Sequence, residues 1–380
     1  MASSAPHLVH GMGTELEAPA WPAITPAEAA GALACFPSAG AMVGLEWHSP
    51  RPFSAATLLR TTNGAFLLKR HHAALRSLAG LAEEHRFSAH LAERGVSVAH
   101  VVPASDGTGA IRLGDWCYEL HHRAPGRDLY RDRHSWTPFL STAHAQAAGA
   151  ALARLHDAAQ GFDAPARRPQ PLVASFTILP AADPLAATQA YVAARPALAA
   201  FLAGRPWERQ IAGLLETFAQ GLSPRLADQP PLWTHNDWHP SNLLWTDAGT
   251  VATTIDFGLA DRTCALHDLA TAIERTAIAW LDLGQGRDAD IASAEAACAL
   301  LAGYATERAL GAGAVETIVR LLPLVHLEFA LSEIDYFAGV VGNPAHADLA
   351  WADYLLGHAD WFASSAGQDF LHRIMQQALR

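Results

Sequence analysis

Three polar residues, Asp237, Asn242 and Asp256, have a spacing that could build a small oxygen-rich site. The last two flank segment 243–255, where an apolar run, an Asp-Ala-Gly turn and a β-branched run predict a β-hairpin. A hairpin brings its two ends together, so we expect Asn242 and Asp256 to lie close to each other. An amide oxygen beside a carboxylate suits Mg²⁺ bound to phosphates, and Asp237 is placed to act as a base. A base and a metal site are what phosphoryl transfer requires of a protein. The alternative interpretation of these three residues is a polar turn before a hairpin, without a catalytic role.

The order of these groups, His-x-Asp-x-x-x-x-Asn and then Asp-Phe-Gly, is the pattern of eukaryotic-type kinases. The spelling His-Asn-Asp-Trp-His-Pro-Ser-Asn-Leu-Leu resembles the catalytic loop of the aminoglycoside phosphotransferase and choline kinase superfamily, and most closely its bacterial homoserine-kinase-like branch. The resemblance implies that Asp237 accepts the proton of a substrate hydroxyl and that Asn242 and Asp256 hold Mg²⁺. It also implies that His235 braces the loop. Asn236 departs from the family, which usually has a small residue there, and should disturb the loop slightly.

An upstream lysine could hold phosphates. The Asn-Gly pair at 63–64 lies between two apolar runs, 55–60 and 65–69, and predicts a β-hairpin whose second strand ends at Lys69. By resemblance, Lys69 would pair with the α- and β-phosphates of ATP. A strand-end lysine that reaches to water is the alternative.

The following segment, 73–94, is expected to be a helix that ends at Gly95. Glu84 lies on its apolar face, whereas Glu83 lies on a polar face. Because a carboxylate on an apolar face needs a buried partner, we expect Glu84 to pair with Lys69. In the alternative, Glu84 pairs with a nearby arginine or faces a cavity.

The nucleotide-binding loop is the least defined part of this prediction. Segment 48–55 takes the place of a GxGxxG loop, which is absent, and Ser54 is its candidate phosphate contact. The absence of those glycines favours small-molecule kinases over protein kinases. No GxxxxGK[ST] sequence occurs, which excludes a P-loop enzyme. The resemblance places backbone groups near Glu119 and His121 against the adenine.

The expected fold is α+β and two-lobed, as in protein kinases. Residues 1–118 form a β-rich, ATP-binding lobe with one long helix, within which 1–24 are expected to be loose. Residues 119–128 connect the lobes, and 129–380 form a mainly helical lobe with the catalytic loop and substrate pocket. Strands are expected within 42–70 and at 111–120, and the hairpin at 243–255 is the one β interruption later on. Helices are expected at 142–158, 185–203, 207–220, 264–283, 290–308 and 314–340. A short helix that opens with a capping box of Thr25 and Glu28 is expected before the first strands.

Substrate recognition is expected in the C-terminal helices. Glu328, Ser332 and Asp335 fall on one helical stripe. If that stripe faces the substrate, its two carboxylates would attract an ammonium-bearing alcohol, such as an amino alcohol, a hydroxy amino acid or an aminoglycoside. A solvated acidic helix face is the alternative.

Two residues near the catalytic loop have two interpretations each. His239 could contact substrate or only brace the loop. Asp268 could anchor the loop, as in similar family members, or could be a carboxylate favoured by its place at a helix start. The histidine pairs 71–72 and 121–122 are adjacent in sequence and so point apart on regular elements, and no HExxH spacing occurs, so no zinc site is expected.

Composition indicates a cytoplasmic enzyme. Length (380 residues) suits two lobes, and the net charge of −11 without a basic cluster argues against nucleic acid or anionic membranes as partners. Four scattered cysteines predict reduced thiols. There is no signal-peptide pattern and no apolar stretch of the ~18 residues that a membrane span needs.

The sequence therefore predicts an ATP- and Mg²⁺-dependent phosphotransferase that acts on a hydroxyl of a small molecule, with an unknown oligomeric state. A bacterial stress-type Ser/Thr protein kinase remains an alternative because it shares these motifs. A non-catalytic pseudokinase scaffold is disfavoured because every motif carboxylate and the lysine are present. No dinucleotide fingerprint or GxSxG elbow supports a redox or hydrolytic enzyme.

Overall fold

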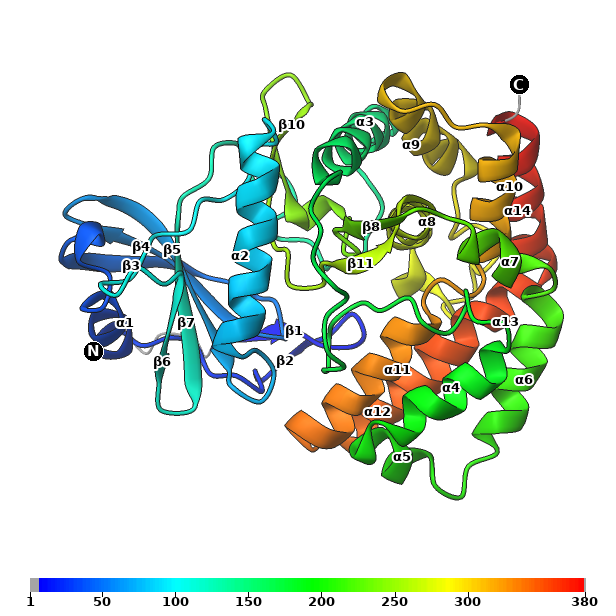
Figure 1. Ribbon diagram of the computed structural model, residues 1–380, viewed down its shortest axis with the longest axis horizontal. Coiled ribbons are helices and arrows are strands. Elements are labelled where there is room, and N and C mark those ends of the chain that lie inside the picture. The colour runs from blue at the N-terminus through cyan, green and yellow to red at the C-terminus, as the bar shows by residue number, and fades with distance from the viewer. Residues whose placement is uncertain (1–6, 379–380) are drawn as a thin grey trace. The chain divides into compact units, whose positions relative to one another are not determined.

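The computed structural model describes residues 7–378, and its backbone divides into two compact units. Unit 1 is the chain as far as Gly126 together with Thr253–Ile255, and unit 2 is Arg127–Ala252 together with the chain from Asp256 onward. The division after Gly126 falls within segment 119–128. Unit 1 is rich in strands and unit 2 in helices, as expected for an α+β protein (Figure 1).

Unit 1 is built on a five-stranded antiparallel sheet with the strand order β3-β4-β5-β7-β6. Its strands are β3 (Met42–His48), β4 (Ala55–Thr61), β5 (Gly64–His72), β6 (Ala110–Leu113) and β7 (Trp116–His122). The hairpin expected at 55–69 is present as β4 and β5. The single strand expected at 111–120 is wrong, because Gly114, with a φ of 60°, turns the chain between β6 and β7. Strand β7 continues to His122, so the connection between units starts later than residue 119.

A helix covers each face of this sheet. Helix α1 (Pro26–Leu33) begins with the expected capping box of Thr25 and Glu28 and packs on the face that contains Leu68 and Leu120. Helix α2 (Leu78–Glu93) contacts the other face through Leu81, and Figure 1 shows it alongside the sheet. Because side chains alternate along a strand, Lys69 and Glu119 point to the α2 face.

Two local expectations for unit 1 are corrected. Helix α2 begins at Leu78 rather than at residue 73, because Ser77 is extended and its hydroxyl accepts a hydrogen bond from the Gly80 N–H at 3.1 Å. Residues 1–6 lie outside the described part of the chain, but the rest of segment 1–24 is not loose. It forms a two-stranded sheet from β1 (Val9–His10) and β2 (Leu16–Glu17), and Trp21 stacks on His72.

Unit 2 consists mainly of helices that pack around α8. Every residue from Leu266 to Thr276 in α8 is buried. Helices α3 and α9 approach closely at Gly149 and Gly303, where an added Cβ would lie 1.9 Å from a carbonyl oxygen of the facing helix. The helices are α3 (Thr142–Ala159), α4 (Pro184–Ala193), α5 (Pro196–Leu202), α6 (Trp207–Phe218), α7 (Leu222–Ala227), α8 (Ala265–Thr276), α9 (Ala294–Glu307), α10 (Ala312–Leu321), α11 (Leu327–Asp335), α12 (Pro344–Leu349), α13 (His358–Ala363) and α14 (Ser365–Ala378).

Several predicted helices are shorter than expected. The segment 185–203 is divided before Pro196, because proline has no N–H to continue a helix, and 314–340 is divided after α10. Two π-helical segments, Tyr336–Val341 and Ala350–Gly357, follow α11 and α12. None of the helices in the described part of the chain has the length and apolar character needed to cross a membrane.

Two pairs of short strands flank the catalytic loop. Strand β8 (Pro231–Thr234) leads into it and pairs with β11 (Asp261–Cys264). The expectation that the hairpin at 243–255 is the one β interruption in this part of the chain is therefore wrong. Strands β9 (Leu243–Trp245) and β10 (Val251–Thr254) form the predicted hairpin.

Candidate active site

The catalytic loop, residues 235–242, connects β8 to β9 and ends in a 3-10 turn, Pro240–Asn242. Asn236 adopts a left-handed backbone with a φ of 59°, which asparagine tolerates better than most residues. Its side-chain oxygen accepts hydrogen bonds from the hydroxyls of Thr234 and Thr263, at 2.9 and 3.2 Å. The loop thus accommodates Asn236 despite the expected disturbance, because the side-chain amide of Asn236 forms hydrogen bonds with both β8 and β11.

Asp268 anchors the same loop from the start of α8. Its carboxylate accepts hydrogen bonds from the backbone N–H groups of His235 and Asn236, at 2.9 and 2.8 Å. The Nε2 of His156 lies 2.9 Å from the same carboxylate, and both side chains are fully buried. Burial raises the pKa of Asp268, but its hydrogen bonds with His156 and with the N–H of Asn236 lower it by more, so the group is an anion. Of the two interpretations of Asp268, the loop anchor is correct.

Asp237 lies at the centre of the loop with 15% of its side chain exposed. Its carboxylate contacts the guanidinium of Arg275 on α8 and accepts a 2.9 Å hydrogen bond from the side-chain N–H of Asn242. The indole N–H of Trp136 lies 3.4 Å away and His239 Nε2 lies 3.5 Å away. Burial raises the pKa of Asp237, but the charges of His239 and Arg275 outweigh it and hold the pKa far below the usual range. The group is therefore an ionised acceptor at neutral pH.

The side-chain amide of Asn242 uses its nitrogen for hydrogen bonds to Asp237 and leaves its oxygen for another partner. Its Nδ2 donates to both the backbone carbonyl and the carboxylate of Asp237, at 2.9 Å each. Because those bonds occupy the amide nitrogen, the oxygen is the atom suited to a cation. Asp256, directly after β10, adopts a left-handed backbone with a φ of 62°. Such strain in a non-glycine residue is typical of functional sites. This oxygen donor set fits Mg²⁺.

The two histidines of the loop are both buried. His235 Nδ1 accepts a hydrogen bond from the backbone N–H of Asp237 at 3.2 Å, and its ring packs against Trp238 and Phe257. His239 Nδ1 lies 3.0 Å from the hydroxyl of Ser241. These contacts give both residues a bracing position beside Asp237.

Lys69 and Glu84, the expected ion pair, lie on facing elements of unit 1. Glu84 is buried on α2, and its carboxylate lies 3.5 Å from the guanidinium of Arg76. The Lys69 ammonium lies 3.8 Å from Glu119, its cross-strand neighbour on β7. Their role in holding phosphates stays a prediction. Ser54 lies in the bend directly before β4.

Glu119 has a different environment from the one expected of a residue in the connection between lobes. It is buried in the sheet, with its carboxylate 3.1 Å from His71, 2.6 Å from His85 and 3.1 Å from His121. Burial raises the pKa of Glu119, but the three histidines lower it well below the usual value. The backbone contact of Glu119 and His121 with adenine stays a prediction.

The carboxylates proposed for substrate binding are occupied by other groups. Glu328 accepts hydrogen bonds from Ser175, Thr177 and the Ile178 N–H, at 2.8 to 3.1 Å. Asp335 accepts one from the Leu198 N–H at 3.2 Å, near the start of α5. Their stripe thus faces segment 172–198, so the expectation that these two carboxylates bind substrate is corrected.

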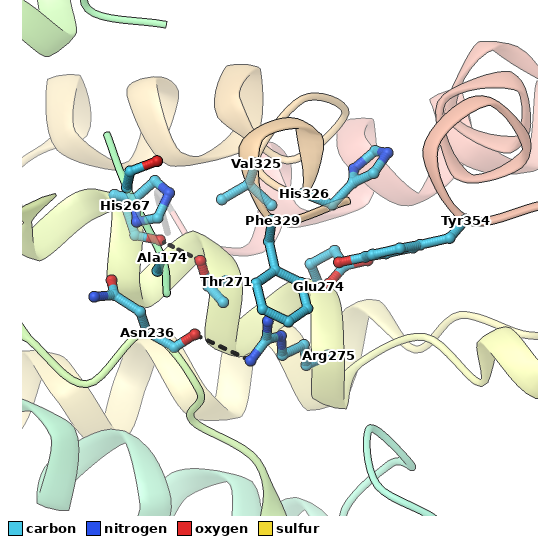
Figure 2. Close-up of a pocket in the computed structure, with 11 residues that line it drawn as sticks. Ala174, Asn236, His267, Thr271, Glu274, Arg275, Val325, His326, Phe329 and Tyr354 are labelled. Atoms are coloured by element: carbon cyan, nitrogen blue, oxygen red, sulfur yellow. Dashed lines mark hydrogen bonds between the residues drawn. The ribbon is translucent and has the colours of Figure 1, made fainter. Parts of the chain in front are cut away.

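A small pocket lies beside the loop, with a volume of about 10 Å³. Figure 2 shows Asn236 and His267 on one side of it and Glu274, His326 and Tyr354 on the other. Sequence reasoning missed Glu274, Arg275 and His326. For Glu274 and Arg275, the signal available in the sequence was that two charged residues are adjacent within a predicted helix. Burial lowers the pKa of His326 to about 4 and raises the pKa of Glu274.

Comparisons with known proteins identify the family. A family model described as the phosphotransferase enzyme family matches residues 51–310. Among solved structures, a microcompartment-associated aminopropanol kinase is 19% identical with a TM-score of 0.60, over 94% of this chain and 99% of the other. Amicoumacin kinase hAmiN, in complex with AMP-PNP, Ca²⁺ and Ami, is 16% identical with a TM-score of 0.53, over 88% of both chains.

An aminoglycoside phosphotransferase from Alicyclobacillus acidocaldarius is 18% identical with a TM-score of 0.50, over 88% of this chain and 93% of the other. No curated protein sequence matches this chain. At these identities the solved structures establish the fold, and they confirm the predicted kinase-like α+β class. The family model covers more than half of the sequence, so this chain is an enzyme that belongs to the phosphotransferase enzyme family.

Proposed function

We propose that this enzyme transfers the γ-phosphoryl group of ATP to a hydroxyl group of a small molecule, with Mg²⁺ as the metal. The observation that carries the proposal is the position of the Asp237 carboxylate, held by Asn242 and Arg275 in a loop that Asp268 anchors. Such a carboxylate accepts a hydrogen bond from the attacking hydroxyl, orients it and takes its proton. Phosphoryl transfer needs little more from a protein than positioning and charge neutralisation.

The metal and phosphate positions follow from the donor groups. The amide oxygen of Asn242 and the carboxylate of Asp256 are the proposed Mg²⁺ ligands. When bound, Mg²⁺ neutralises charge on the phosphate oxygens. Lys69, supported by Glu84 or Glu119 on neighbouring elements, is proposed to hold the α- and β-phosphates, with Ser54 near them. AMP-PNP in the complex of the amicoumacin kinase supports nucleotide binding.

The proposed acceptor is a small amino alcohol, a hydroxy amino acid such as homoserine, or an aminoglycoside-like alcohol. The names of the similar structures, which include an aminopropanol kinase and an aminoglycoside phosphotransferase, support this range. With Glu328 and Asp335 occupied, His239 remains a candidate for contact with the acceptor because it lies beside Asp237.

The test is Mg²⁺-dependent ADP release with aminopropanol, homoserine, choline, ethanolamine, aminoglycosides and a generic protein as acceptors. Wild type should respond to one small acceptor well above its ATPase background. Asp237→Asn should bind Mg²⁺-ATP with unchanged affinity but lose at least ~100-fold in kcat, as expected for loss of a positioned base. Asp247→Asn is the matched control, because Asp247 lies exposed in the next turn and pairs with the exposed Arg127. Near-full turnover by Asp237→Asn would refute the base assignment.

A further inference from the structure

We propose that Glu274, His326 and His358 form a binding site for a divalent transition-metal ion such as Zn²⁺. This site is separate from the proposed Mg²⁺ ligands and does not depend on the kinase assignment. The three residues come from α8, the start of α11 and the start of α13. Each offers one ligand atom to a group whose members all lie within 4.8 Å of one another. All three side chains are buried, so the group is not a set of solvated surface residues.

Two of the ligand atoms already have a spacing close to that around an ion. Glu274 Oε1 and His358 Nδ1 are 3.0 Å apart. Two ligands of a tetrahedral zinc ion, each at ~2.0–2.1 Å from the metal, are about 3.3 Å apart. A small movement of either side chain would therefore admit the ion, which would displace the hydrogen that these two atoms now share.

His326 is prepared to be the third ligand. Its Nε2 lies 3.0 Å from the backbone carbonyl of Leu355. A carbonyl can only accept, so Nε2 carries the hydrogen and Nδ1 carries a lone pair. Nδ1 is buried and has no hydrogen-bond partner in the described part of the chain. A ring N–H bonded to a carbonyl is the arrangement that fixes metal-binding histidines, because it sets the tautomer and the ring orientation.

The surroundings hold the three ligands in place. His358 stacks on Trp280 with ring centroids 3.5 Å apart, and the Trp280 indole N–H donates to the backbone carbonyl of Glu274 at 2.9 Å. The Leu355 carbonyl lies in the π-helical segment Ala350–Gly357, and π-helical turns are frequent at functional sites.

The donor set selects the kind of ion. Two imidazoles and one carboxylate suit Zn²⁺ and its neighbours, whereas Mg²⁺ and Ca²⁺ prefer oxygen ligands. Three protein ligands leave one coordination position open. Glu274 and His326 also line the pocket beside Asn236, so this open position is available to water or to a small molecule in that pocket (Figure 2).

The experiment uses the full chain, freed of metal with a chelator and then held in excess Mg²⁺, which occupies the oxygen site. Titration with Zn²⁺ should show one equivalent bound. Co²⁺ should give the intense visible absorption of a four-coordinate ion. Glu274→Gln, His326→Gln and His358→Gln should each weaken Zn²⁺ binding by at least ~100-fold, since losing even a hydrogen-bond partner of a ligand costs about 10–100-fold.

His267→Gln is the matched control, because His267 is also buried and lines the same pocket but is not in the three-residue group. It should leave Zn²⁺ affinity unchanged. X-ray absorption of the zinc-loaded wild-type protein should show two imidazole ligands, and the loss of this signal in His326→Gln separates the site from His85, Glu119 and His121, which could also hold a metal ion. The proposal is overturned if Zn²⁺ does not bind, if fewer than two imidazoles surround it, or if His267→Gln loses as much affinity as the three ligand variants.

Discussion

Replacing Asp268 by asparagine tests whether a buried carboxylate holds the catalytic loop. An asparagine has the same shape, but only one of its two terminal atoms can accept hydrogen bonds. Asp268 receives backbone N–H groups on both oxygens, from His235 and Asn236, so one of them must lose its acceptor. A hydrogen bond to a charged group contributes about 1.5–3 kcal/mol, and a buried unpaired N–H costs about 1–3 kcal/mol. Allowing for relaxation, we expect the variant to lose about 3 kcal/mol of unfolding free energy.

Urea unfolding followed by circular dichroism measures this loss. The control is Asp247→Asn, which breaks a salt bridge in which both side chains are more than two-thirds exposed and should change the unfolding free energy by less than about 0.5 kcal/mol. Asp268→Asn should also lower kcat at least ~10-fold, because the loop that carries Asp237 moves. A loss below about 1 kcal/mol would show that the loop keeps its place without this carboxylate and would refute the reasoning.

Three further predictions follow from buried or close-packed groups. Asn236→Ala should cost about 1 kcal/mol more unfolding free energy than Asn236→Gly, because alanine is strained at a φ of 59° and glycine is not; equal losses in urea unfolding would contradict this. Burial raises the pKa of Glu333 from 4.5 to about 8, so the native state holds a proton that the unfolded chain releases, and stability should fall as pH rises from about 4.5 to 8. Glu333→Gln should remove this pH-dependent loss of unfolding free energy, which amounts to up to about 5 kcal/mol in wild type. If the melting temperature changed equally with pH in both proteins, the prediction would be wrong. Gly149→Ala should cost more than about 2 kcal/mol by forcing α3 from α9, whereas Gly213→Ala, in an exposed part of α6 with open space, should add about 0.5–1 kcal/mol; thermal unfolding of the pair checks the contrast.

Local patterns were sufficient for the catalytic loop and the main elements of unit 1. The spacing of Asp237 and Asn242 is a property of one short segment, so the structure brings them together as the sequence suggested. The capping box at Thr25 and the hairpin at 55–69 were equally local. These features depend on residues only a few positions apart, where turn and cap preferences dominate.

Contacts between distant segments could not be predicted in this way. Arg275 reaches Asp237 from another element, and His156 meets Asp268 from α3. Nothing in the periodicity of either helix specifies those partners. The helical stripe of Glu328 and Asp335 was identified correctly as a stripe, but helix periodicity cannot tell a surface that receives a neighbouring chain segment from one that receives a ligand.

The allocation of Thr253–Ile255 to unit 1 affects the order in which the enzyme can fold during synthesis. The hydroxyl of Thr253 donates to the carbonyl of Pro125 at 2.7 Å, and the N–H of Thr254 donates to the carbonyl of Ser97 at 3.0 Å. Residues 127–252 must be made before these partners leave the ribosome. At about 5–20 residues per second, the earlier part of unit 1 waits on the order of 10 s for these hydrogen bonds. A ribosome-bound chain that ends before residue 253 therefore presents an unfinished unit 1 to chaperones and proteases.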